Sequence, residues 1–131
     1  MYDLIIIGGG PAGVAAGVYA ARKRLRTLLL TYDFGGQSIV STDIQNWIGT
    51  KNITGENLAK NLEAHVRAYE SADFVVATGV KVKSVAQKGK NFTVTDNADK
   101  TYETQAVLVA TGAERRKLTV PGAKEFEHKG I

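Results

Sequence analysis

Three glycines near the start of the chain have the types and the spacing of a phosphate-binding turn. Gly8, Gly10 and Gly13 form the pattern G-x-G-x-x-G within "IIIGGGPAG". In such a turn the first glycine allows a tight bend, the second lets a pyrophosphate approach the backbone, and the third lets a helix pack close to a strand. Amide groups at the helix start, together with the helix dipole, would then bind a dianion. The alternative is a glycine-rich turn that binds no ligand.

The elements predicted around this turn are those that a dinucleotide site requires. Residues 3–7 are a short apolar run, which predicts a strand buried on both faces. Pro11 suits the first turn of a helix over residues 11–24, and the basic residues 22–24 suit its C-terminal end. Residues 26–31 predict a second buried strand. The order strand, helix, strand predicts a right-handed βαβ unit and favours the ligand-binding interpretation of the glycines.

One position departs from the general dinucleotide-binding pattern. An acidic residue normally lies at the end of the second strand, where it binds the adenosine ribose. Thr31 occupies that place in this chain, and Asp33 lies two residues later. The requirement for an acid is therefore met poorly.

The middle of the chain predicts a long loop and then a helix. Residues 32–54 have no clear period, and a loop of that length is usually functional or disordered; its apolar residues argue against disorder. From Gly55 the pattern is helical, and Thr54 is the candidate N-cap. The predicted apolar stripe of this helix consists of Leu58, Leu62, His65, Val66 and Tyr69.

The remaining sequence predicts strands followed by a connector. Residues 73–105 alternate apolar and polar side chains, which predicts a small antiparallel meander with one solvated face. Residues 106–113 predict a further buried strand that ends in a tight turn. Residues 114–131 have no strong period. The sequence thus predicts an α/β fold over residues 1–113 and a connector over residues 114–131.

Composition and charge weigh against several other classes of protein. A chain of 131 residues with 44% hydrophobic content corresponds to one globular domain. The absence of cysteine excludes disulfides and thiolate metal sites within the chain, and His65 and His128 are too isolated for a metal cluster. The net charge of +4 includes no dense basic run, so we expect no nucleic-acid partner. The first apolar run is too short for a signal peptide or a membrane span, so a cytoplasmic location is expected.

Four motifs together resemble one family of flavoproteins. They are "GGGPAG" at residues 8–13, "GGQ" at 35–37, "NWIG" at 46–49 and "VATGA" at 109–113. Their order and spacing are similar to the N-terminal FAD-binding half of bacterial thioredoxin reductases and of the related flavoprotein component of alkyl hydroperoxide reductase. In that family the second strand often ends in a small residue, as at Thr31. The resemblance implies a Rossmann-like FAD/NAD(P)-binding domain with a parallel sheet and a small antiparallel meander.

The resemblance also implies positions for the cofactor. The pyrophosphate would be wrapped by the first turn, and the ribose would lie near Thr31. Gly36 and Gln37 would approach the cofactor from the long loop, Asn46 would reach toward the flavin beside Trp47, and the Val82 backbone would meet the adenine. The full predicted cofactor set is Gly8, Gly10, Pro11, Ala12, Gly13, Thr31, Gly36, Gln37, Asn46, Val82, Ala110, Thr111, Gly112 and Ala113. The alternatives are a turn role for Asn46, core packing for Trp47, and a simple strand-ending turn at residues 111–112.

The family's other parts are not found in this sequence. They are a second G-x-G-x-x-G domain for NADPH, a Cys-x-x-Cys pair and a late Gly-Asp motif that closes the FAD domain. We therefore expect an incomplete fragment of a larger enzyme, with residues 114–131 leading toward an NADPH-binding domain. The parent would pass reducing equivalents from NADPH through FAD to a disulfide in a thioredoxin-like partner and is expected to be a homodimer. No catalytic residue is predicted in this chain, which alone would be inactive.

Two other functions remain open at this stage. Ferredoxin or flavodoxin NADP reductases of the thioredoxin-reductase type share the FAD half but lack the cysteine pair. A non-catalytic dinucleotide-binding module would use the same turn without any redox chemistry.

Overall fold

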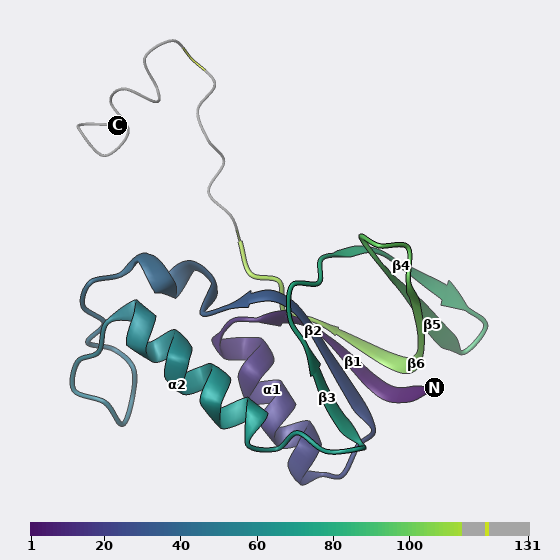
Figure 1. Cartoon of the computed structure of the whole chain (residues 1–131), viewed down its shortest axis with the longest axis horizontal. Helices are drawn as coiled ribbons and strands as arrows, with labels where there is room; N and C mark the ends of the chain where they lie inside the picture. Colours follow the sequence, from purple (N-terminus) through teal and green to yellow (C-terminus); the bar gives the residue numbers. More distant parts are fainter. Residues whose placement is uncertain (114–119, 121–131) are drawn as a thin grey trace.

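The computed structural model describes residues 1–113 and residue 120 of the 131-residue chain. They form a six-stranded sheet with two helices on one face (Figure 1). Along the chain the elements are β1 (Tyr2–Gly9), α1 (Pro11–Arg22), β2 (Thr27–Phe34), η1 (Gly36–Val40), α2 (Gly55–Arg67), β3 (Phe74–Ala77), β4 (Val82–Lys88), β5 (Asn91–Asp96) and β6 (Thr101–Val109). The predicted α/β fold, with a parallel sheet and an antiparallel meander, is confirmed.

The strand order β3-β2-β1-β6-β5-β4 joins a parallel half to an antiparallel half. Strands β3, β2, β1 and β6 are parallel neighbours, whereas β6, β5 and β4 pair antiparallel. The apolar runs explain the centre of the sheet. Ile5 and Ile6 in β1 and Leu28 to Leu30 in β2 are at most 2% exposed, because both faces of these strands are covered.

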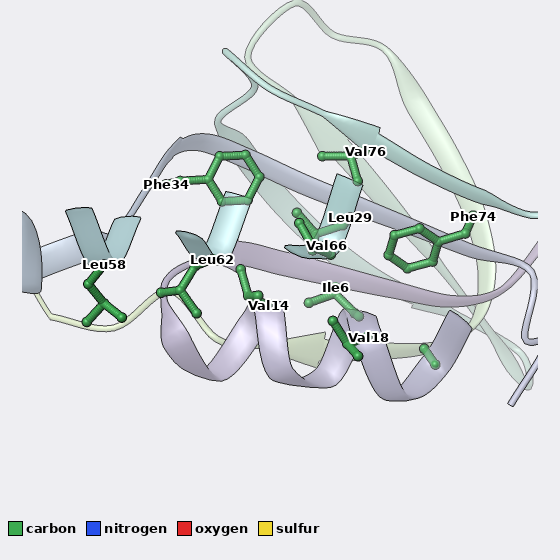
Figure 2. Close-up of a cluster of buried hydrophobic side chains, with 11 residues drawn as sticks. Ile6, Val14, Val18, Leu29, Phe34, Leu58, Leu62, Val66, Phe74 and Val76 are labelled. Carbon is green, nitrogen blue, oxygen red and sulfur yellow. The ribbon is translucent and has the colours of Figure 1, made fainter. Parts of the chain in front are cut away.

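The helices pack against one face of the parallel strands through a single apolar cluster. Figure 2 shows side chains from α1, α2 and the strands pointing toward one another in this cluster. Val14 and Val18 come from α1, and Leu62 and Val66 come from α2. Gly17 lets α1 approach closely, since an added β-carbon would lie 3.1 Å from atoms of Leu29 and Val66. The helix pair and the parallel strands therefore form one rigid platform.

The meander covers the opposite face of the same strands. Ile5, Ile7, Leu28 and Leu30 form a second buried cluster with Val94 of β5. The turn between β5 and β6 is held by Asp96, whose carboxylate accepts hydrogen bonds from the backbone amides of Ala98 and Lys100, both at 2.9 Å. The Tyr102 hydroxyl donates a further bond of 2.9 Å to the same carboxylate.

Three predicted boundaries are wrong, each because strand pairing overrides local pattern. Residues 74–77 do not belong to the meander; they form β3, which pairs parallel with β2 at the far edge. The meander begins at β4, after Gly79 with φ +74°, and not at residue 73 as predicted. The two predicted strands within 101–113 are one strand, β6, and most of its residues after Thr104 are exposed rather than buried.

Smaller differences concern strand and helix ends. Strand β2 continues to Phe34, beyond the predicted end at Thr31. Helix α1 ends at Arg22, two residues before the predicted end. Arg24 has φ +58°, a left-handed conformation that does not occur within a right-handed helix. The N-cap of α2 is confirmed, since the Asn57 amide donates to the Thr54 hydroxyl. In the predicted stripe of α2, His65 is exposed instead of packed.

None of the helices formed by the described residues has the length and apolar content needed to span a bilayer. Apart from Val120, the predicted connector over residues 114–131 lies outside the described residues.

Candidate functional site

A large cavity lies at the carboxyl ends of the parallel strands. Its volume is about 1130 Å³, slightly above the usual range for small-molecule pockets. Five segments line it: the glycine turn after β1, the end of β2, the start of η1, the start of β4 and the turn after β6. In the sheet, β2 and then β3 lie on one side of β1, and β6 pairs with β1 on its other side. Ligands of open α/β sheets bind at such a topological switch point.

The three motif glycines are required for different reasons. Gly8 has φ +121°, and a β-carbon there would overlap the Ala110 carbonyl oxygen. A β-carbon on Gly13 would overlap the Gly8 carbonyl oxygen. Gly10, however, has the extended conformation φ −75° and ψ −179°, which any residue can adopt, and nothing lies within 4 Å of an added β-carbon. The fold itself therefore does not require a glycine at position 10, but close approach of a ligand would.

The N-terminus of α1 faces this space without a cap. Gly10 is the N-cap residue and offers no side-chain hydrogen bond, and no acidic residue lies in the first turn. Pro11 has no amide proton to donate, so the first donors are the amides of Ala12 and Gly13. Their alignment with the helix dipole suits a phosphate group.

The second turn lies directly against the first. The Ala110 amide donates to the Ile7 carbonyl at 2.8 Å, which continues the β1–β6 pairing into the turn. Gly112 has φ +68°, a conformation that favours glycine, and nothing lies within 4 Å of an added β-carbon. Residues 110–113 all line the cavity.

The long loop contributes its first residues to the site. Gly35 and Gly36 have φ of +94° and +54°, and the Gly35 amide donates to the Gly9 carbonyl at 3.1 Å. A β-carbon on Gly36 would lie 3.8 Å from the Gly10 Cα, so the start of η1 adjoins the glycine turn. Gln37 is exposed and lines the cavity, with an amide that can both donate and accept.

The far end of the cavity is formed by β2 and the β3–β4 connection. The amides of Gly79 and Val80 donate to the carbonyls of Tyr32 and Thr31, each at 3.0 Å. The Lys81 ammonium lies 4.3 Å from the centre of the Tyr32 ring. These bonds bring Val80 and Val82 beside the end of β2, where both line the cavity.

The structure brings most of the predicted cofactor residues together. Those that line the cavity are Gly8, Gly10, Pro11, Ala12, Thr31, Gly36, Gln37, Val82, Ala110, Thr111, Gly112 and Ala113. Two predicted residues lie outside the cavity lining: Gly13, which is buried, and Asn46, which is exposed on the long loop. Trp47 is 36% exposed.

Several lining residues are absent from the predicted set, among them Tyr32, Asp33, Ser38, Lys81 and Lys83. The sequence carries one signal that Tyr32 and Asp33 belong to the second strand, which is the apolar residue Phe34 directly after them. Strand β2 continues to Phe34, and this side chain is buried. No such signal marks Lys81 and Lys83. Within residues 1–113, no group of three or more His, Cys, Asp or Glu side chains could hold a metal ion.

A family model and curated relatives both match this chain over nearly its whole length. The family model described as pyridine nucleotide-disulphide oxidoreductase matches residues 2–131. Alkyl hydroperoxide reductase F of Staphylococcus aureus is 37% identical over 130 residues, which cover 99% of this chain and 25% of that protein. The corresponding protein of Pseudomonas aeruginosa is 36% identical with the same coverage.

Solved structures of thioredoxin reductases share the fold. The enzyme of Lactococcus lactis superposes with a TM-score of 0.86 and 32% identity, over 98% of this chain and 41% of that one. The enzyme of Streptococcus pyogenes gives 0.82 and 34%, over 96% and 40%. The chain therefore spans about a quarter of the length of the curated relatives and two fifths of the solved ones.

Proposed function

Since this chain belongs to the pyridine nucleotide-disulphide oxidoreductase family, we propose that it forms the first part of the FAD-binding domain of an NADPH-dependent disulfide reductase. The family and the resemblance to thioredoxin reductases and alkyl hydroperoxide reductase F are the premise. FAD, NADPH and a thioredoxin-like disulfide partner are the proposed participants.

The observation that carries the proposal is the open space at Gly10. The fold requires a glycine where φ is positive or where a neighbouring atom would clash with a β-carbon. Gly10 has a negative φ and no atom within 4 Å of an added β-carbon. Its missing side chain leaves room in front of the uncapped helix start, at the switch point of the sheet. A pyrophosphate in that room would contact the main-chain amide of Ala12, and the dipole of α1 would favour its negative charge.

The other lining segments have suitable chemistry for the rest of FAD. The second turn, residues 110–113, presents backbone without bulky side chains along the dinucleotide. Gly36 and Gln37 would approach from the start of η1, and the adenosine half would lie between the end of β2 and Val82. Asn46 stays a candidate for the flavin side.

The proposed domain is residues 1–113, continued by a connector over residues 114–131. Two surfaces support its completion by a further segment of the same protein. Helix α1 carries no charged residue before Arg22, and its residues Ala15 and Tyr19, which lie outside the cavity lining, are exposed. On β6, Leu108 pairs with Ile6 on the helix face of the sheet and is 37% exposed. A further segment packed on these two elements would bury their exposed apolar side chains.

Bound FAD would supply two-electron transfer from NADPH to a disulfide. The residues of this chain would bind and orient the cofactor, and the sequence contains no cysteine to form the disulfide itself. We therefore propose binding activity for this chain and no turnover by the chain alone.

The test is titration of the purified chain with FAD, measured by flavin fluorescence and by thermal unfolding. A ligand that binds the folded state raises its stability. Gly10→Leu should fold as the wild type does and lose at least about tenfold in FAD affinity, because the new side chain occupies the phosphate space.

Ala15→Leu is the matched control, since it places the same leucine side chain at an exposed position of α1 outside the cavity lining. It should bind FAD as the wild type does. Wild-type protein without FAD affinity, or equal affinity in Gly10→Leu, would refute the proposed function.

A further inference from the structure

We infer that a second, small cavity at the amino ends of β2 and β3 binds a small zwitterion of the α-amino acid class. The end of α1 and the turn after it, the turn after α2 and the start of β3 line this cavity. Its volume, about 160 Å³, corresponds to about five water molecules. The glycine turn lies at the carboxyl ends of the strands, so the inference does not rest on the proposed binding of FAD.

Backbone hydrogen bonds hold the walls of the small cavity in place. The Thr27 amide donates to the Asp73 carbonyl at 2.8 Å, which joins the start of β2 to the start of β3. The Ser71 amide donates to the Phe74 carbonyl at 2.9 Å and closes the turn after α2. In Figure 1, α1 and α2 both end near the starts of β2 and β3. The cavity is therefore formed by the fold itself.

Arg24 lines the cavity from a position that normally selects glycine. The Arg24 amide donates to the Ala21 carbonyl at 2.9 Å. The Leu25 amide donates to the Ala20 carbonyl at 3.1 Å. These bonds make the end of α1 a Schellman motif with Arg24, at φ +58°, as its left-handed residue. Glycine is the usual residue there because it has no β-carbon, so the backbone of this turn does not explain an arginine.

The helix dipole does not explain Arg24 either. Arg22 and Lys23 already place positive charge at the end of α1, where the dipole favours it, and neither lines the cavity. Arg26 adds a further exposed cation nearby in the chain. The excess of positive charge around this end of the helix attracts anionic groups. Arg24 is the member of this group that can meet such an anion inside the cavity.

The polar groups of the small cavity are available to a ligand. Arg24 and Asp73 both line it, yet neither forms an ion pair with any residue that the structure describes. The Ser71 hydroxyl oxygen accepts from the amides of Asp73 and Phe74 at 3.3 and 3.1 Å. Both of its lone pairs are thereby used, so the hydroxyl can offer a ligand only its proton. The cavity thus combines two donor groups with one carboxylate.

This combination suits a molecule that carries a carboxylate and an ammonium group together. The guanidinium of Arg24 can bind a carboxylate through two parallel hydrogen bonds, and the Ser71 hydroxyl can donate a third. The Asp73 carboxylate can accept from the ammonium group. A small apolar side chain of the ligand would lie against Ala21 and Leu25. The volume restricts the class to amino acids with short side chains.

The experiment titrates the full chain with L-alanine and follows the backbone amide resonances by NMR. The signals of Leu25 and Ser71 should shift and reach saturation. Propionate lacks the ammonium group and ethylamine lacks the carboxylate, so each should bind at least about tenfold more weakly than L-alanine.

Arg24→Gly separates a ligand role from a structural one. The variant should bind L-alanine at least about tenfold more weakly than the wild type. Its thermal midpoint should equal or exceed that of the wild type, because glycine adopts the left-handed conformation without strain. Asp99→Gly is the matched control, since Asp99 also has a positive φ, +60°, and lies outside the cavity lining. Lys23→Ala controls for charge, and both controls should keep the wild-type affinity.

Four results would overturn the inference. They are a wild type without saturable shifts, propionate or ethylamine that binds as tightly as L-alanine, Arg24→Gly with unchanged affinity, and Arg24→Gly with a clearly lower thermal midpoint. The last result would mean that the arginine is kept for the fold. Arg24→Gly should bind FAD as the wild type does, so loss of either binding activity is distinguishable from loss of the other.

Discussion

The carbonyl oxygen of Gly8 occupies the space that a β-carbon on Gly13 would need. The first turn and the start of α1 are therefore in direct backbone contact, and no side chain can separate them. Gly10, three residues before Gly13, has open space at the same position. One motif thus contains glycines kept for packing and a glycine kept for a ligand.

This difference predicts that the same small substitution destabilises the fold at Gly13 and leaves its stability almost unchanged at Gly10. Gly13→Ala should destabilise the chain by about 1–3 kcal/mol, because the new methyl group displaces the Gly8 backbone. Gly10→Ala should leave the free energy of unfolding within about 0.5 kcal/mol of the wild type, since its conformation suits any residue. Urea unfolding without FAD measures both. Equal loss in the two variants would contradict the assignment of roles.

The bond between Tyr102 and Asp96 predicts a pH-dependent stability. Burial raises the pKa of Tyr102 to about 12, and the hydrogen bond to Asp96 adds to the rise. Burial also raises the pKa of Asp96, but the bonds from Tyr102, Lys100 and Ala98 outweigh burial and leave it lowered. The Tyr102 contribution is thus complete below pH 10 and lost as pH rises toward 12, whereas the Asp96 contribution is lost as pH falls below about 4.

Tyr102→Phe tests this bond. The variant should unfold a few degrees lower than the wild type near neutral pH, and the difference should shrink above pH 10, where the wild type loses its advantage. Thermal unfolding from pH 5 to pH 11 measures it. Tyr19→Phe, which alters an exposed phenol, should match the wild type throughout. A difference that does not change with pH would argue against the bond.

The cap of α2 predicts a modest, specific loss. Thr54→Ala removes the acceptor for the Asn57 amide and should cost about 1 kcal/mol of stability. Thr54→Ser keeps a hydroxyl and should cost less than about 0.5 kcal/mol. Chemical denaturation distinguishes the two, and an equal loss would mean that the methyl group matters more than the cap.

The core of the platform depends on Phe74. Its side chain is 2% exposed and packs in the cluster shown in Figure 2. Phe74→Ala should destabilise the chain by about 3–5 kcal/mol, because the cavity left behind cannot be filled by the surrounding elements. Val40→Ala, at an 80% exposed position, should change stability by less than about 0.5 kcal/mol. A small loss at Phe74 would show that the strand edge at β3 is not part of the cooperative fold.

Local signals in the sequence suffice for the first βαβ unit and for the family. The apolar runs of β1 and β2, the glycine spacing and the alanine-rich α1 are such signals, since each element is specified by neighbouring residues. The four motifs identify the family for the same reason, because their order does not depend on how the strands pair.

Strand pairing and the meeting of the site residues depend on the tertiary structure. An alternating pattern predicts a strand but names no partner, so the pattern alone assigns β3 to the meander although it pairs with β2. The two extra residues of β2 are equally invisible in the sequence, because the register of a strand is set by its neighbour. That register brings the Asp33 backbone beside Gly9 of the glycine turn. The sequence alone does not show this proximity, because Asp33 lies two residues beyond the predicted end of the second strand.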